Sequence, residues 1–364
     1  MPGNPVARLN VGYEGEEFTV TTIQKVAELA GVSTATVSRA LAGKKSVSES
    51  TRAKVETAAK ELGYVASSAA SSLASGRNRN VGVLVPFLDG WFYIRVLKGA
   101  HAALSDAGYD LTLYHLDQSA TDSGVRANPR RERLFDEFLR RQRVDGFIAV
   151  SLELTDAELE SLRTIGKPVI GIGGPLPRAM TLSIDDTAIA RLATEHLLAL
   201  GHREIAHIGG DPLLDLDFHL PARRRVGYEA ALESRGIAPD PLLVRVADFT
   251  IAGGYHATLQ LLGDPRVSPT AVFAASDEMA MGAIMAARDL GKKVPEDLSI
   301  IGIDGHELGE FFGLTTVSQF PETQGRLAAE AVLRVLDGEP AAARNVPLPF
   351  ELVVRRSTSA PADR

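Results

Sequence analysis

Residues 21–64 read TTIQKVAELAGVSTATVSRALAGKKSVSESTRAKVETAAKELGY, and this stretch decides the fold of the N-terminal part of the chain. Gly31 stands where a helix needs a left-handed C-cap, and Ser33 follows as the N-cap of a second helix. Ala27 is small where that second helix must cross closely over the first. Apolar residues recur at helical spacing in three segments, residues 23–30, 34–41 and 48–62. The spacing predicts a helix-turn-helix, with a plain helical bundle as the alternative.

Charge is divided unevenly along the 364 residues, whose net charge is −7. Residues 19–79 hold nine Lys and Arg against four Glu, a net charge of +5. Residues 1–18 carry −2, which leaves −10 for residues 80–364. A basic block joined to an acidic body is the asymmetry expected when one end of a protein contacts phosphates. The charge therefore favours a nucleic-acid partner for the N-terminal block.

In a helix-turn-helix the N-terminal end of the second helix enters the major groove of DNA. We expect Thr34, Ala35 and Arg39 to face base edges, and Arg39 to pair with O6 and N7 of a guanine. Short hydroxyls and positive charges suit phosphate contacts, and the residues that offer them are Thr22, Ser33, Thr36, Ser38, Lys44 and Lys45. Helix capping is the alternative role of each hydroxyl.

The run over residues 21–64 resembles the headpiece of the LacI/GalR family of transcriptional regulators. Later segments resemble the sensor domain of the same family, which is similar to periplasmic sugar-binding proteins. They include LLALGHREIAHIGG (197–210), RVGYEAALESRG (225–236) and PTAVFAASDEMAMGAIMAARDLGKKVPEDLSIIGIDG (269–305). The resemblance implies an all-α headpiece followed by an α/β sensor domain of two Rossmann-like lobes.

Residues 65–79, VASSAASSLASGRNR, lie between these two parts and are rich in Ala and Ser. Composition alone is typical of a flexible linker. The resemblance implies a hinge that becomes a short helix on DNA, with Leu73 inserted into the minor groove. We therefore divide this end of the chain into a disordered extension (1–18), a headpiece (19–65) and a hinge (66–79).

From residue 80 the pattern alternates between apolar strands and amphipathic helices, which predicts parallel sheets covered on both faces. The segments that we expect to be strands are 81–87, 110–116, 146–151, 168–172, 181–185, 204–208, 242–247, 271–276 and 298–303. The helices between them include 92–107, 187–200, 223–234 and 278–290. The resemblance implies one lobe of residues 80–184 with 320–347 and another of residues 185–318 with 348–364.

The resemblance also implies a ligand in the cleft at the carboxyl ends of the strands. It points to Arg224 and Asp304 as the pair that binds vicinal hydroxyls, since one offers a donor fork and the other two acceptor oxygens. The alternatives are a solvated helix start for Arg224 and a capping role for Asp304.

Other candidates for the same cleft are aromatic or small. Trp91, Phe92 and Phe249 could stack on a ring face, or could belong to the core instead. Ser276 stands where the family commonly has Asn, and Gly173 where it commonly has Asp. Both differences remove polar groups, so we do not expect a common hexose to be the ligand.

Several classes of protein are excluded or disfavoured. The chain has no cysteine, which rules out disulfides, thiolate catalysis and cysteine-ligated metal sites. Its eight histidines are scattered without metal-binding spacing, and it has no phosphate-binding loop, so we expect no enzyme, metal or cofactor. The first twenty residues are charged and lack a long apolar run, so we expect a cytoplasmic protein with no membrane segment.

The sequence thus predicts a homodimeric repressor of double-stranded operator DNA, because two recognition helices on one face of DNA need a twofold protein. We expect a small-molecule effector, a sugar or sugar derivative, with a nucleoside, nucleobase or other metabolite as the alternative. A transporter's solute-binding protein would share the sensor fold but would need an export signal and no headpiece. An enzyme on the same lobes would turn its ligand over.

Overall fold

The computed structural model describes residues 21–41, 46–64, 76–116, 131, 133, 135, 143–174, 176–177, 179–211, 219–340 and 344–362. The chain divides into two compact units, Met1–Asn78 and Arg79–Arg364. Each unit is described by itself.

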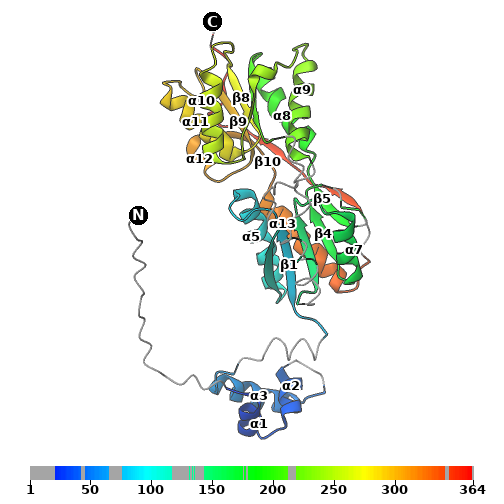
Figure 1. Cartoon of the computed structure of the whole chain (residues 1–364). Helices are drawn as coiled ribbons and strands as arrows, with labels where there is room; N and C mark the ends of the chain where they lie inside the picture. Colours follow the sequence, from blue (N-terminus) through cyan, green and yellow to red (C-terminus); the bar gives the residue numbers. More distant parts are fainter. Residues whose placement is uncertain are drawn as a thin grey trace, which may run out of the picture. The chain divides into compact units, whose positions relative to one another are not determined.

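The described residues of the first unit form the helices α1 (Ile23–Ala30), α2 (Thr34–Leu41) and α3 (Glu49–Glu61) (Figure 1). Gly31 ends α1 in the left-handed region, with φ 65° and ψ 36°, as the turn requires. The side chain of Ser48 accepts a hydrogen bond from the backbone N–H of Thr51 and so caps α3. The buried core that joins the helices is made of Val26, Ala27, Val37, Ala40, Val55, Ala58 and Ala59.

The second unit contains two six-stranded sheets, and each belongs to one lobe. In the first lobe the strand order is β11-β5-β4-β3-β1-β2, and every neighbouring pair is parallel. Its strands are β1 (Asn80–Val85), β2 (Asp110–His115), β3 (Gly146–Val150), β4 (Val169–Ile172), β5 (Met180–Ser183) and β11 (Asn345–Pro347).

In the second lobe the order is β12-β10-β9-β8-β6-β7, parallel except for the antiparallel pair of β10 and β12. Its strands are β6 (Ile205–Gly209), β7 (Val244–Val246), β8 (Ala271–Ala274), β9 (Ser299–Asp304), β10 (Thr315–Ser318) and β12 (Glu351–Val353). The chain therefore passes between the lobes more than once, because β11 and β12 are neighbours in sequence but belong to different sheets.

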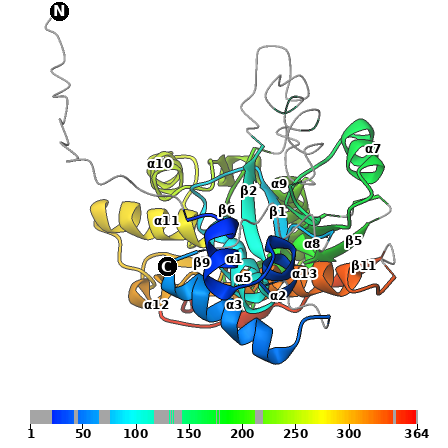
Figure 2. The same cartoon turned by 90° about the horizontal axis from the view of Figure 1, so that it is seen from below.

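Helices cover both sheets. The first lobe has α5 (Trp91–Asp106), α7 (Asp156–Thr164) and α13 (Pro321–Leu336). The second has α8 (Asp186–Ala199), α9 (Leu220–Glu233), α10 (Ile251–Leu262), α11 (Asp277–Asp289) and the short α12 (Gly309–Phe312). Helices α10 and α11 lie side by side in both views (Figure 1 and Figure 2).

Helices α5 and α13 touch almost backbone to backbone, although more than 200 residues separate them in sequence. A Cβ added at Gly99 would lie 1.8 Å from the backbone oxygen of Glu322, and one added at Gly325 would lie 1.9 Å from that of Val96. Only glycine permits this approach. The contact joins a helix from the start of the sensor unit to one from near its end.

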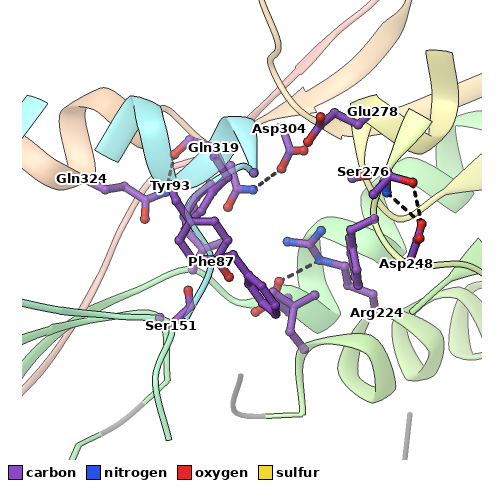
Figure 3. A pocket seen from close by; sticks show the side chains of 18 of the residues that line it. Phe87, Tyr93, Ser151, Arg224, Asp248, Ser276, Glu278, Asp304, Gln319 and Gln324 are labelled. Atoms are coloured by element: carbon purple, nitrogen blue, oxygen red, sulfur yellow. Dashed lines mark hydrogen bonds and ion pairs between the residues drawn. The ribbon is translucent and has the colours of Figure 1, made fainter. Parts of the chain in front are cut away.

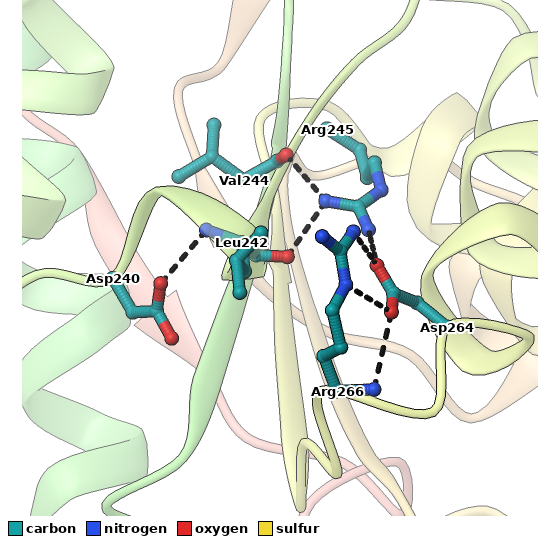
Figure 4. A network of polar contacts seen from close by, with 6 residues as sticks. All are labelled: Asp240, Leu242, Val244, Arg245, Asp264 and Arg266. Atoms are coloured by element: carbon teal, nitrogen blue, oxygen red, sulfur yellow. Dashed lines mark hydrogen bonds and ion pairs between the residues drawn. The ribbon is translucent and has the colours of Figure 1, made fainter.

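The outer edge of the second sheet, strand β7, is held by an arginine pair (Figure 4). Nη1 of Arg245 donates to the carbonyl oxygens of Leu242 (2.6 Å) and Val244 (2.9 Å), and Nη2 lies 3.2 Å from Oδ2 of Asp264. Arg266 binds the same carboxylate at 2.7 Å and holds the pKa of Asp264 well below its usual range. Charges on an edge strand hinder its pairing with another chain.

All nine predicted strand segments overlap observed strands, and the four helices predicted after residue 80 overlap α5, α8, α9 and α11. Strands β10, β11 and β12 were not among the predicted segments. Each is only three or four residues long. In the described part of the chain, no helix combines the length and the apolar character needed to cross a membrane.

Candidate functional site

The first candidate site is the exposed start of α2 in the headpiece. Thr34 and Ala35, in its first turn, are exposed, and Arg39, five residues after Thr34, is exposed as well. Val37 and Ala40 are buried in the headpiece core, so the same helix has one face fixed and another available for contact. This is the arrangement that a groove-binding helix requires.

The hydroxyls around α2 divide between capping and exposure. Oγ of Ser33 accepts from the backbone N–H of Thr36 at 3.2 Å and lies 2.9 Å from its Oγ1, so Ser33 caps α2. Thr22 is the N-cap residue of α1, but its exposed side chain makes no capping hydrogen bond. Ser38 is partly buried. Lys44, Lys45 and the hinge residue Leu73 lie outside the described residues.

The second candidate site is a cleft in the sensor unit that receives residues from both lobes (Figure 3). Phe92 and Tyr93 come from α5, Phe87 comes from the segment between β1 and α5, and Phe249 comes from the opposite lobe. Polar side chains lie among these rings. A concave, largely apolar surface with a few polar groups is the usual form of a small-molecule site.

Arg224 is the charged residue fixed most firmly in the cleft. It lies on α9 with 3% of its surface exposed, and Nε donates to Oδ1 of Asp186 at 2.9 Å. Nη1 donates to the carbonyl oxygen of Ala275, at the end of β8. Burial raises the pKa of Asp186, and the charge of Arg224 opposes that rise. The predicted alternative of a solvated helix start does not hold for this side chain.

Asp304 is the last residue of β9, and it lines the cleft. Its backbone φ is 139°, a value that residues other than glycine rarely adopt. Nε2 of Gln319 donates to its Oδ1 at 2.5 Å, and the backbone N–H of Asp277 lies 3.4 Å from its Oδ2. Burial raises the pKa of Asp304, and the neighbouring Asp277 raises it further, which favours a protonated carboxyl. A protonated Asp304 can donate a hydrogen bond as well as accept one.

Asp277 has a structural role behind Asp304. Its Oδ2 accepts from the backbone N–H groups of Gly305 (3.0 Å) and His306 (2.8 Å), which fixes the turn after β9. Its own pKa is raised by burial. This turn sets the position of the Asp304 side chain.

The remaining predicted cleft residues take different positions. Phe92, Gly173, Phe249 and Ser276 line the cleft, and Oγ of Ser276 also caps α11 by accepting from the backbone N–H of Met279 at 3.2 Å.

Trp91 lies beside the cleft rather than in its lining. Its indole stacks on His306 with ring centroids 4.4 Å apart, and its Nε1 donates to Oε2 of Glu307 at 2.5 Å. These contacts join α5 of the first lobe to the turn after β9 of the second.

Sequence reasoning missed several lining residues, among them Ser151, Asp186, Asp248, Glu278, Gln319 and Gln324. For two of them a signal was present: Ser151 follows β3 and Gln319 follows β10 at the carboxyl ends of parallel strands, where α/β ligand sites form. Asp186 had none, because the adjacent Asp185 is equally polar and instead caps α8, accepting from the backbone N–H of Ala188 at 3.0 Å. Among the described residues, no three His, Asp or Glu side chains gather as a metal site would require.

Comparison with known proteins agrees with this geometry. Residues 22–67 match the model of "Bacterial regulatory proteins, lacI family", and residues 194–358 match that of a periplasmic binding protein-like domain. The transcriptional repressor CytR of Escherichia coli K12 is 34% identical over 349 residues, which covers 95% of this chain and 98% of CytR.

Two solved structures are similar over 93% of this chain and 99% of their own. One is a complex of the transcriptional regulator CelR with cellobiose, at 33% identity and a TM-score of 0.67. The other is a lac repressor dimer bound to operator and the anti-inducer ONPF, at 28% identity and a TM-score of 0.79. With a headpiece matched at one end and a sensor domain at the other, this chain belongs to the lacI family of bacterial regulatory proteins, which are DNA-binding transcription regulators.

Proposed function

We propose that this chain is a homodimeric repressor whose affinity for a pseudo-palindromic operator is controlled by a sugar or sugar derivative bound between its two lobes. The observation that carries the proposal is that Arg224 and Asp304 line the same cleft, together with aromatic side chains from both lobes. A buried donor fork and a carboxyl group suit neighbouring hydroxyls, and the flat rings suit a sugar face.

On the DNA side, Thr34, Ala35 and Arg39 read base edges, while Thr22, Ser33, Thr36, Ser38, Lys44 and Lys45 contact phosphates. The exposed start of α2 supports the first set. Leu73 inserts into the minor groove at the centre of the operator. A dimer follows from the symmetry of two half-sites, and the lac repressor structure is itself a dimer.

The physical link between the two sites is the arrangement of the lobes. A ligand that contacts both lobes favours one relative position of them, and it changes operator affinity only by its preference between the two positions. Residues from both lobes line the cleft, and the stack of Trp91 on His306 also spans them. Both features support a ligand response that is expressed as lobe movement.

The test begins with a thermal-shift screen of the full-length protein against sugars, polyols and nucleosides, because a ligand that binds the folded state raises its melting temperature. Hits are then added to operator-binding assays. We expect a hit to change operator affinity in the wild type but not in Arg224→Ala, which should still bind operator. Arg225→Ala, on the same helix but outside the cleft lining, is the control and should keep the response. A normal dose response in Arg224→Ala would exclude this cleft.

A further inference from the structure

Among the described residues that line the cleft, carboxyl groups outnumber cations, and the one cation is paired with a carboxylate. Five carboxyl groups line it, those of Asp89, Asp186, Asp248, Glu278 and Asp304, against the guanidinium of Arg224. Nε and Nη1 of Arg224 are bound to Asp186 and to the carbonyl oxygen of Ala275. The positive charge of Arg224 is therefore balanced within the protein before any ligand arrives.

Helix N-termini are the other common anion sites, and at three that begin at the cleft a side chain of the protein already faces a backbone donor, whereas α9, whose Leu220 also lines the cleft, begins without a side-chain cap. At the start of α5 the backbone N–H of Trp91 favours the charged form of Glu278, against the larger effect of burial, which raises the pKa of that carboxyl. Ser276 caps α11, and Oγ1 of Thr250 accepts from the backbone N–H of Gly253 and caps α10 at 2.9 Å. An anionic group in the cleft would therefore compete with a side chain of the protein at each of these three helix starts.

The carboxylates at the margin of the cleft are also held in place. Oδ1 of Asp248 accepts from Oγ1 of Thr250 at 2.6 Å, and the side chain is exposed. Glu278 is partly buried. Carboxylates with low-dielectric walls between them create a negative potential that repels anions more strongly than it would in open water.

The deeper polar groups are uncharged or close to neutral. Ser151 is buried, and Gln319 and Gln324 are buried amides, with Nε2 of Gln324 donating to the carbonyl oxygen of Gln319 at 2.7 Å. Burial favours the protonated form of Asp304. These groups can exchange neutral hydrogen bonds with hydroxyls but provide no countercharge for an anion.

We propose that the cleft selects its effector by charge, and that it accepts an uncharged, hydroxylated ring and rejects the same ring when it carries a phosphate or carboxylate. A phosphate would have to give up its hydration shell beside fixed carboxylates without gaining an unpaired cation. The inference rests on the proposed function, because it assumes that this cleft is the effector site.

The test uses matched neutral and phosphorylated probes on the full-length protein. Isothermal titration compares D-ribose with ribose 5-phosphate, D-glucose with glucose 6-phosphate, and cytidine with cytidine monophosphate. For any pair with a binding neutral member, we expect the phosphate to bind at least about tenfold more weakly. A phosphate that binds as tightly as its neutral partner, or more tightly, overturns charge selection while leaving the proposed function intact.

A pair of neutralising substitutions assigns the effect to the cleft. In the double variant Asp248→Asn, Glu278→Gln, the ratio of the Kd of the phosphorylated probe to that of its neutral partner should fall by about fivefold or more. We call this ratio the gap. The control is Glu233→Gln combined with Glu296→Gln, which makes the same change in net charge at exposed positions outside the cleft lining and should leave the gap unchanged. A gap that narrows equally in both double variants would refute a local origin.

If no neutral probe binds, the proposed function is refuted for the ligands tested. The charge of the cleft is then tested by a measurement that needs no ligand. Trp91 is the sole tryptophan of the chain and stands between the cleft residues Gly90 and Phe92 in the sequence. The quenching constant of each ion for Trp91 is divided by its constant for free N-acetyltryptophanamide. This normalised constant should be larger for caesium than for iodide. Iodide quenching that equals or exceeds caesium quenching on that scale would overturn the inference.

Discussion

Replacement of Arg224 by Ala tests both the packing and the electrostatics of the cleft. Arg224 has 3% of its surface exposed and is bonded to Asp186 and to the backbone of Ala275. Removing it leaves a carboxylate and a carbonyl group without their partner. Breaking a buried ion pair in this way costs about 3–5 kcal/mol of folding free energy. The side chain of Asp186 is still 16% exposed, so water can replace part of the lost interaction and we expect about 3 kcal/mol.

The folding free energy that is lost in Arg224→Ala should depend on pH. Burial raises the pKa of Asp186 and Asp304, and the charge of Arg224 opposes both rises. Without Arg224 both folded-state pKa values move further upward. A carboxyl whose folded-state pKa is raised loses stability as the pH increases above its unfolded-state pKa, because the folded state resists ionisation. Arg224→Ala should therefore be more destabilising at pH 8 than at pH 5.

Urea unfolding followed by the fluorescence of Trp91 measures this loss in the sensor unit, because the chain has no other tryptophan. The control is Arg225→Ala on the same helix, where the guanidinium is 38% exposed and pairs with Glu229 at 2.8 Å. An exposed pair of that kind contributes less than about 1 kcal/mol. Equal effects at the two arginines, or a loss at Arg224 that does not grow with pH, would refute the reasoning.

Three further predictions concern the headpiece, the sensor core and the joint between helices. Arg39→Ala should weaken operator binding by about 1–3 kcal/mol and binding to random duplexes by much less, as measured by fluorescence anisotropy; equal losses would argue against base reading. Burial lowers the pKa of His207 to about 4, and the ring packs against those of both Tyr228 and Phe273, so the neutral form is favoured in the folded state. Stability should fall by about 1.4 kcal/mol per pH unit as the pH drops from 6.5 towards 4, and His207→Phe should remove that part of the pH dependence in urea titrations; an unchanged slope would contradict the assignment. Gly99→Ala places a Cβ 1.8 Å from the backbone oxygen of Glu322. It should lower the free energy of unfolding by about 1–3 kcal/mol in the same assay. A variant as stable as the wild type would show that α5 and α13 cross less closely than described.

Much of the fold could be predicted because its signals are local. The turn at Gly31 requires a positive φ that glycine adopts readily, and the structure confirms it. The central strands of both sheets are continuous apolar runs, as buried parallel strands must be, so their positions were visible in the sequence.

The rest depends on pairings between distant segments. Strand β11 takes its place through parallel pairing with β5, and β12 through antiparallel pairing with β10, and neither short segment carries its register in its own composition. The cleft combines Arg224 of α9 with Asp186 of α8, and Asp304 of β9 with Gln319 after β10. Sequence spacing could not distinguish Asp185, which caps a helix, from Asp186, which pairs with the arginine.

The central claim, that α2 of this chain recognises a defined operator under the control of the sensor cleft, is tested most directly by selecting bound duplexes from a random pool with the full-length protein. We predict enrichment of a pseudo-palindromic site that binds at least about 1,000-fold more tightly than random duplex, with an affinity that falls as salt increases and shifts when a cleft ligand is added. A pool that yields no enriched sequence at any salt concentration, with or without ligand, would contradict the account.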